Sequence, residues 1–120
     1  MPRMRNSSIK IYHCLLQNNI MIFLNVGGVL YATSRETLSL QDNFFRALVK
    51  SENNTEEPIF IDRDPSLFRY ILNWLRGVPV LPDDSFCLKE LLYESEFYCM
   101  TDLREEVEKK ILKLERKKGY

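Results

Sequence analysis

The chain has 120 residues, of which 45% are hydrophobic and 28% charged. This length and composition are typical of one folded domain and exclude a wholly disordered chain. Seventeen basic residues balance seventeen acidic ones, which argues against a general nucleic-acid or membrane-surface binder, because both classes carry a basic excess. The charge is unevenly distributed: residues 1–19 and 104–120 each carry +3, whereas residues 20–103 hold seven basic and thirteen acidic side chains, a net −6.

The first 19 residues are polar and weakly periodic, so we expect a polar N-terminal arm over 1–19. The most apolar run, residues 20–31, is shorter than a membrane span and is interrupted by Asn25, Gly27 and Gly28; direct membrane insertion is therefore not expected. Three cysteines at scattered positions do not predict a disulfide framework, and they favour a reducing, cytoplasmic location.

The apolar run divides into two strand-like segments, about 20–26 and 29–33, and Gly27-Gly28 between them predicts a hairpin turn. Ser34 predicts the cap of a short helical turn, and a second helix carrying Phe44 and Phe45 should follow. Adjacent helical residues point 100° apart, so one phenylalanine can face outward and serve as an anchor for a partner.

A short, fully apolar segment over 59–61 predicts a strand inside the sheet. The helix after it has clear boundary signals, with Asp64 as N-cap, Pro65 in the first turn and Gly77 at the C′ position. Tyr70 and Trp74 lie off the centre of its apolar stripe, which leaves both core packing and partner contact open.

The connector 78–82 is expected to be extended, and Asp83 or Asp84 then predicts the start of another helix. One face of that helix is predicted to carry Leu88, Leu91, Leu92, Ser95 and Cys99.

The last helix should be capped by Thr101 and run to about Lys118. Its seam of Val107, Ile111 and Leu114 fits either a short coiled coil or docking on its own domain. The order of two strands, helix, strand and a helical second half predicts an α+β fold, a small sheet with helices clustered against it.

Patterns that would support catalysis are weak. Gly27-Gly28 lacks the further glycines or the lysine of a phosphate-binding loop. Asp62 and Asp64 are separated by Arg63 and lack a further acidic ligand at metal spacing. The one histidine, His13, lies in the predicted arm and is a poor candidate for a catalytic base. We therefore predict no catalytic, cofactor or metal site, and a protein that is not an enzyme.

Three segments resemble the signatures of the potassium-channel tetramerisation (T1) type of BTB/POZ domain. They are FLNVGGVLYATSRETL at 23–38, IFIDRDPSLFRYILNWLRG at 59–77 and LLYESEFY at 91–98, where alanine is more usual than Ser95. The FIDRDP run at 60–65 is most similar to the soluble KCTD branch of that family. The resemblance predicts a BTB/T1-type oligomerisation domain over 20–104 and a basic C-terminal helix extension over 105–120.

The resemblance implies a small mixed sheet flanked by helices, and homo-oligomeric rings of four subunits in channels and often five in the soluble branch. Several channel T1 domains hold zinc through a histidine and an adjacent cysteine pair; no Cys-Cys pair occurs here, so zinc is not expected. Contacts between subunits in such rings are polar. The subunit-interface residues predicted on this basis are Asn25, Arg35, Asp62, Arg63, Asp64 and Arg76.

Many KCTD proteins are substrate adaptors of cullin-3 ubiquitin ligases. By resemblance the cullin would contact the loop 51–57 and the segment 79–88. The partner-binding residues predicted from the sequence are Phe45, Glu56, Glu57 and Phe86. The alternative function is the cytosolic assembly domain of a potassium channel or of a channel regulator. About sixteen residues follow the matched region. We therefore expect the chain to be either an oligomerisation domain on its own or a piece of a longer protein.

Overall fold

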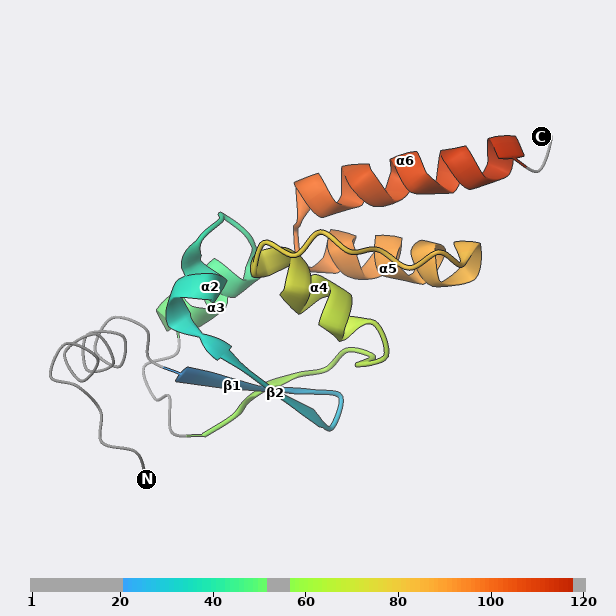
Figure 1. The fold of residues 1–120 in the computed structure, drawn as a ribbon. Coiled ribbons are helices and arrows are strands. Elements are labelled where there is room, and N and C mark those ends of the chain that lie inside the picture. The colour runs from blue at the N-terminus through green and yellow to red at the C-terminus, as the bar shows by residue number, and fades with distance from the viewer. Residues whose placement is uncertain (1–20, 52–56, 118–120) are drawn as a thin grey trace, which may run out of the picture.

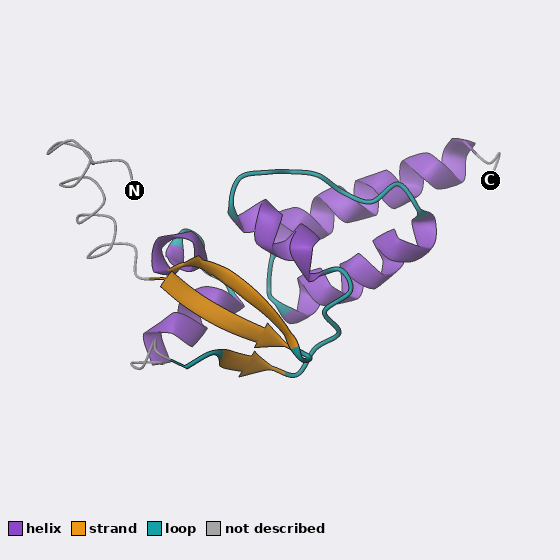
Figure 2. Cartoon of the chain, turned by 60° about the horizontal axis from the view of Figure 1, so that its bottom comes forward, coloured by secondary structure: helices purple, strands orange, loops and turns teal. Residues whose placement is uncertain are grey.

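The computed structural model describes residues 21–51 and 57–117. Figures 1 and 2 show a sheet on one side of the molecule with helices packed over one of its faces, an α+β fold as predicted. In chain order the elements are β1 (Met21–Val26), β2 (Val29–Ser34), α2 (Arg35–Ser39), α3 (Phe44–Ser51), β3 (Ile59–Ile61), α4 (Phe68–Leu75), α5 (Ser85–Phe97) and α6 (Thr101–Lys117).

Within the described residues, the sheet has three strands in the order β2-β1-β3. β1 pairs antiparallel with β2 and parallel with β3, so the sheet is mixed. The prediction that 59–61 is an internal strand is wrong, because β1 takes the centre and leaves β3 at an edge with the Phe60 side chain 62% exposed. An apolar run identifies a strand, but it does not fix the position of the strand in the sheet.

The β1–β2 hairpin turns at two glycines with positive φ, +55° at Gly27 and +101° at Gly28, a conformation that side chains with a Cβ disfavour. The amide of Gly28 donates to Asn25 Oδ1 (2.8 Å), and the amide of Gly27 donates to the carbonyl of Ile61 (3.0 Å). A Cβ on Gly27 would lie 2.4 Å from the Arg63 carbonyl oxygen. The hairpin tip is thus fastened to the segment that follows β3.

The core lies between the inner face of the sheet and the helices. Inward-facing residues alternate along β1, where Ile22, Leu24 and Val26 are buried. An aromatic cluster continues the core into the helices: Phe45 stacks on Tyr98 with ring centroids 4.7 Å apart, and both rings contact Phe68.

Most helix ends follow the local signals in the sequence. The Ser34 side chain accepts from the amide of Thr37 at the start of α2, and Asp84 accepts from Cys87 at the start of α5. Gly77, with φ of +84°, ends α4 as predicted. Asp64 is not the N-cap of α4, however, because the helix begins at Phe68, after a turn.

The face predicted for α5 is mostly correct, since Leu88, Leu91 and Ser95 are buried and Leu92 is half-buried. Cys99 is an exception: it lies beyond the end of the helix in a left-handed conformation (φ +56°) and is exposed. The chain leaves the helix there, so the helical periodicity used in the prediction no longer applies.

Helix α6 packs alongside α5 of its own domain. Of the two alternatives for its apolar seam, a short coiled coil or docking on its own domain, the structure shows the docking. Val107 is fully buried, and Ile111 and Leu114 are partly buried against the core. Trp74 of α4 is half-buried, and its indole Nε1 donates to Asp102 Oδ2 in the first turn of α6 (3.0 Å).

Candidate functional site

Reactive side chains are scattered in the part of the chain that the structure describes. Among these residues, no three His, Cys, Asp or Glu side chains lie close enough together to hold a metal ion. The hydrogen bond between Cys87 and Asp84 raises the pKa of the Cys87 thiol, which disfavours the nucleophilic thiolate.

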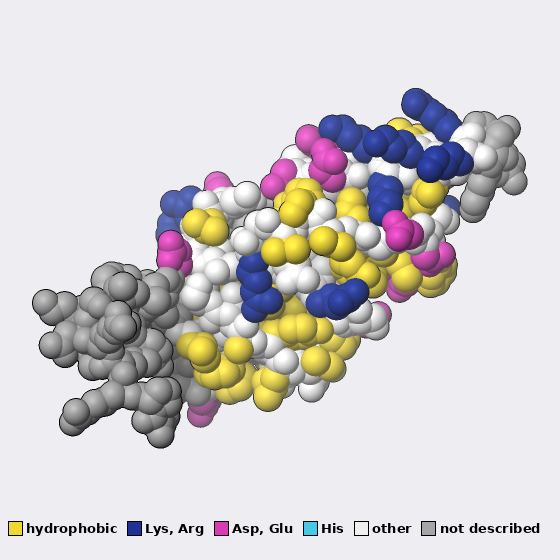
Figure 3. Space-filling view, viewed as in Figure 1, with side chains coloured by type: hydrophobic (Ala, Val, Ile, Leu, Met, Phe, Trp, Pro, Cys, Tyr) yellow, Lys and Arg dark blue, Asp and Glu magenta, His cyan; other side chains and the backbone are white. Residues whose placement is uncertain are grey.

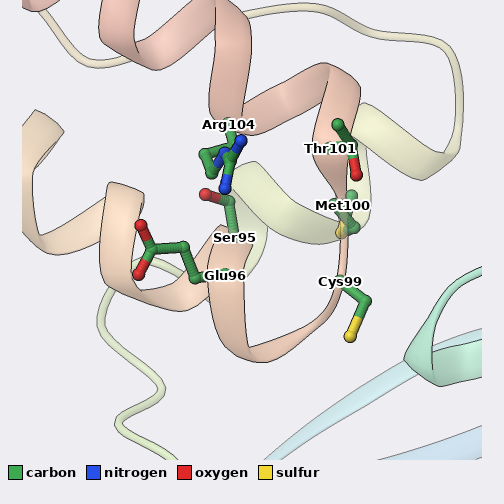
Figure 4. A pocket seen from close by; sticks show the side chains of 6 residues that line it. All are labelled: Ser95, Glu96, Cys99, Met100, Thr101 and Arg104. Atoms are coloured by element: carbon green, nitrogen blue, oxygen red, sulfur yellow. The ribbon is translucent and has the colours of Figure 1, made fainter.

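Three pockets formed by residues that the structure describes are small or open. The pocket in Figure 4, of about 100 Å³, lies where α5 passes into α6 and is lined by Ser95, Glu96, Cys99, Met100, Thr101 and Arg104. The hydroxyl of Ser95 donates to the Leu92 carbonyl in its own helix (2.7 Å), and Figure 4 shows Cys99 pointing away from Arg104. The pocket therefore does not pair a nucleophile with a base.

Of the predicted interface residues, Arg63 is held in place by contacts with two side chains of its own chain, Glu94 and Phe97. Its guanidinium forms two hydrogen bonds to Glu94, Nε to Oε1 at 3.2 Å and Nη2 to Oε2 at 2.5 Å, and it lies 4.2 Å from the centre of the Phe97 ring. The hydrogen bond to Glu94 raises the pKa of Arg63. Arg63 thus has a partner within its own chain, supplied by α5, and this pairing was missed from the sequence because the two residues are 31 positions apart.

The acidic neighbours of Arg63 face solvent. Asp62 and Asp64 are both exposed, and Asp64 Oδ1 accepts from the hydroxyl and the amide of Ser66, which lowers the pKa of Asp64. Because the hairpin tip is fastened to this segment, Asn25 lies close to it. Four of the six predicted interface residues, Asn25, Asp62, Arg63 and Asp64, are therefore grouped around the hairpin turn.

The other two predicted interface residues lie elsewhere. Arg76 is exposed and donates from Nη2 to the carbonyl of Ala32 (2.7 Å), along β2. Arg35, at the start of α2, donates from Nη1 to the carbonyl of Val49 near the end of α3 (3.1 Å). The six residues consequently do not form one compact patch.

The predicted partner-binding residues differ in their exposure to solvent. Phe45 is fully buried in the aromatic cluster, so the prediction that it anchors a partner is wrong. Of the two adjacent phenylalanines, Phe45 faces the core. Phe44 is half-buried and packs against Phe97. Phe86, in the first turn of α5, is 69% exposed, and Glu57 is exposed. Glu56 lies outside the described residues.

The sequence reasoning missed an apolar surface on the sheet. We call it the outer sheet face, and it consists of Met21, Phe23, Asn25, Leu30, Ala32 and Phe60. Figure 3 shows hydrophobic side chains along the sheet side of the molecule. The signal in the sequence is that β1 does not alternate: Met21 and Phe23 are apolar although the helices cover only the opposite face.

None of the helices within residues 21–51 and 57–117 is long and apolar enough to cross a membrane. A family model of the BTB/POZ domain matches residues 22–108. SH3KBP1-binding protein 1 of Bos taurus is 42% identical over 88 residues, 69% of this chain and 12% of that protein. The human BTB/POZ domain-containing proteins KCTD21 and KCTD3 are 38% and 41% identical, over 78% and 69% of this chain. The chain spans 38% of KCTD21 and 11% of KCTD3, so it is similar to a part of each relative.

Proposed function

Because this chain belongs to the potassium-channel tetramerisation type of the BTB/POZ family, a family of protein-interaction and oligomerisation domains, we propose that it assembles into a homo-oligomeric ring and acts as a KCTD-type adaptor of a cullin-3 ubiquitin ligase. We propose a ring of four or five subunits and a cytoplasmic location. The similarity to KCTD21 and KCTD3 over most of the chain carries the proposal.

The exposed charges around the hairpin support assembly through polar contacts. Asp62 and Asp64 present carboxylates to solvent on either side of Arg63, which is already paired with Glu94. An arginine of a neighbouring subunit is a suitable partner for these carboxylates, and Arg76 is exposed. The proposed interface therefore still consists of Asn25, Arg35, Asp62, Arg63, Asp64 and Arg76. Within it, Arg63 holds the segment after β3 against α5 of its own subunit through Glu94 and does not form an ion pair with the neighbouring subunit.

The exposed apolar side chains at the start of α5 and before it support a docking site for cullin-3. Phe86 is 69% exposed, and Val78 and Val80 in the connector are 44% and 54% exposed. A phenylalanine that projects from the first turn of a helix is a typical interface anchor. Phe86 and Glu57 remain as proposed partner-binding residues.

Binding of the full chain to the purified cullin-3 N-terminal domain, measured by calorimetry, tests this function. We expect saturable binding that Phe86→Ala weakens at least ~10-fold, the effect of losing one aromatic anchor. Leu112→Ala, at a comparably exposed apolar side chain of α6, is the matched control and should bind as the wild type does. Absence of binding by a folded, assembled wild type would contradict the adaptor role and favour a channel-assembly domain.

A further inference from the structure

Helices α5 and α6 lie side by side (Figures 1 and 2) and form an apolar groove on the surface of the molecule. The groove, which we call the α5–α6 groove, has a volume of about 300 Å³ and is lined by Leu92, Glu108, Ile111 and Leu112. Leu112 is 52% exposed, whereas Leu92 and Ile111 are partly buried and pack against the core. The groove thus combines apolar side chains with a carboxylate at its edge.

The connector that precedes α5 leaves this groove open. Lys110 ties the connector to α6, because its Nζ donates to the Leu81 carbonyl (3.4 Å) and to Asp83 Oδ1 (2.8 Å). Residues two positions apart point about 200° apart around a helix, so Leu112 projects from the other side of α6. An apolar hollow that stays exposed in this way is typical of a binding site for a partner.

The charges of α6 are unevenly arranged around the helix. Residues three, four and seven positions from Glu108 share its side of α6. These residues are Thr101, Arg104, Glu105, Ile111, Leu112 and Glu115. Together with Glu108 they supply three carboxylates and one guanidinium. The other basic residues of the helix point in other directions: Lys109, Lys110, Lys113, Arg116 and Lys117.

The cations beside the groove neutralise part of this negative charge. Arg104 Nε lies 3.7 Å from Glu108 Oε1, and both side chains are about half exposed, so the pair is weak. On α5, Lys89 and Glu96 lie three positions before and four positions after Leu92, and their charges cancel. The edge of the groove is therefore acidic, although α6 carries more basic than acidic residues.

We propose that the α5–α6 groove is a docking site for a basic amphipathic helix of a partner protein. Such a helix lays its apolar face in a hydrophobic groove, with anchors at positions i, i+3, i+4 and i+7. Lysine or arginine residues beside that face would pair with the glutamates at the groove edge. The site shares no residue with the proposed subunit interface or with Phe86, so it extends the proposed function to a second kind of partner.

Binding of synthetic peptides to the full chain, measured by isothermal titration calorimetry, tests this proposal. The probe is a peptide of about four helical turns with leucine at positions i, i+3, i+4 and i+7 of each repeat and lysine elsewhere. A second peptide carries glutamate in place of every lysine. We expect saturable binding of the lysine peptide, and binding of the glutamate peptide that is at least ~10-fold weaker, because like charges then meet at the groove edge.

Two glutamates of α6 provide a matched pair of variants. The Glu108 and Glu106 side chains are both 49% exposed, and each forms an ion pair within the helix. Glu108→Lys reverses a charge at the groove edge and should weaken binding of the lysine peptide at least ~5-fold. Glu106→Lys makes the same change on another side of α6 and should bind as the wild type does. Leu112→Ala should weaken binding at least ~5-fold through the loss of apolar contact. Circular dichroism checks the fold of each variant.

Failure of the folded wild type to bind the lysine peptide would overturn this inference. Equal binding of the two peptides, or equal weakening by Glu106→Lys and Glu108→Lys, would also overturn it, since the groove would then have no part in selecting the peptide. Loss of homo-oligomer assembly in Leu112→Ala would make the groove a subunit contact and would overturn it as well. Cullin-3 binding is measured separately, so this inference can fail while the proposed function stands.

Carbene footprinting of the wild type locates the bound peptide without any substitution. Labelling of Leu112 should fall at least ~3-fold on saturation with the lysine peptide, because a residue at the centre of an interface loses most of its contact with solvent. Labelling of Leu40, which is 62% exposed at the end of α2, should not change. Unchanged labelling of Leu112 in the presence of bound peptide would overturn the inference.

Discussion

At the scale of single residues, the ion pair of Arg63 and Glu94 connects the segment after β3 to α5. Both side chains are mostly buried, 28% and 14% exposed, so solvent screens the pair less than it would a surface pair. Removing one partner leaves the other charge poorly solvated.

Reversing the charge in Arg63→Glu is expected to lower the free energy of unfolding by about 2 kcal/mol, because two carboxylates then face each other beside the Phe97 ring. The double variant Arg63→Glu/Glu94→Arg should recover about half of the loss. Urea unfolding followed by circular dichroism measures both. Arg69→Glu, at an exposed arginine that contacts Tyr70, is the control, and a loss of similar size there would contradict the role of the pair.

The two glycines of the hairpin differ in their surroundings, which provides a matched comparison. In Gly27→Ala the new methyl would meet the Arg63 carbonyl oxygen and the Pro65 ring, whereas nothing lies within 4 Å of the corresponding position at Gly28. Both substitutions carry the strain of positive φ, about 1 kcal/mol, and Gly27→Ala should cost about 3 kcal/mol in total because the backbone must shift. Equal losses in urea unfolding would show that the hairpin tip is not fastened to the segment after β3.

At the scale of the elements, Lys110 links α6 to the connector that precedes α5. Its Nζ donates to Asp83 Oδ1 (2.8 Å) and to the Leu81 carbonyl (3.4 Å). The hydrogen bond from Lys110 lowers the pKa of Asp83 below its usual value of 3.8. The stabilising contribution of a carboxylate with a lowered pKa is complete above the unfolded pKa and is lost as the pH falls through the folded pKa.

The difference in melting temperature between wild type and Lys110→Met should therefore be constant from pH 7 to about 5 and shrink below about pH 4. Differential scanning calorimetry at several pH values measures this difference. Lys113→Met, which alters an exposed lysine of the same helix, should show no such pH dependence. A difference for Lys110→Met that persists unchanged at pH 2 would rule out Asp83 as the titrating partner.

Most elements whose signals are local could be predicted from the sequence, with the cap at Asp64 as an exception, and those fixed by tertiary contacts could not. The glycine turn, the Ser34 cap and the Gly77 helix end depend on one to three neighbouring residues, and all three were predicted. The cap of α5 was predicted at Asp83 or Asp84, and it lies at Asp84. The edge position of β3 follows from β1 pairing with β2 on one side and β3 on the other, which the sequence of β3 alone does not indicate.

The same distinction applies to the candidate site. The choice between Phe44 and Phe45 as the exposed ring depends on Tyr98, more than fifty residues away, and the intrachain partner of Arg63 is likewise distant. The apolar residues Met21 and Phe23 break the alternation of apolar and polar side chains in β1. They indicate an exposed apolar face only when it is known that the helices cover one face of the sheet.

At the scale of the whole molecule, the charges along the sequence are segregated. The net −6 of residues 20–103 belongs to the segment that holds the sheet and most of the helices, while α6 carries basic residues toward its C-terminal end. Basic side chains there are favourable for the dipole of α6 itself, so the helix does not need a nucleic-acid partner to account for them.

The proposed self-association would also make the stability of the fold depend on protein concentration. Any partner that binds only the native state raises the melting temperature by mass action, and for a homo-oligomer the partner is the protein itself. We expect the melting temperature of the wild type to rise by about 5 °C or more over a hundredfold increase in protein concentration. Calorimetry of Asp62→Arg, which reverses an exposed charge of the proposed interface, should show a much smaller rise, while Leu112→Asp, at an exposed leucine of α6, should follow the wild type. A wild-type melting temperature independent of concentration would mean that folding and assembly are uncoupled.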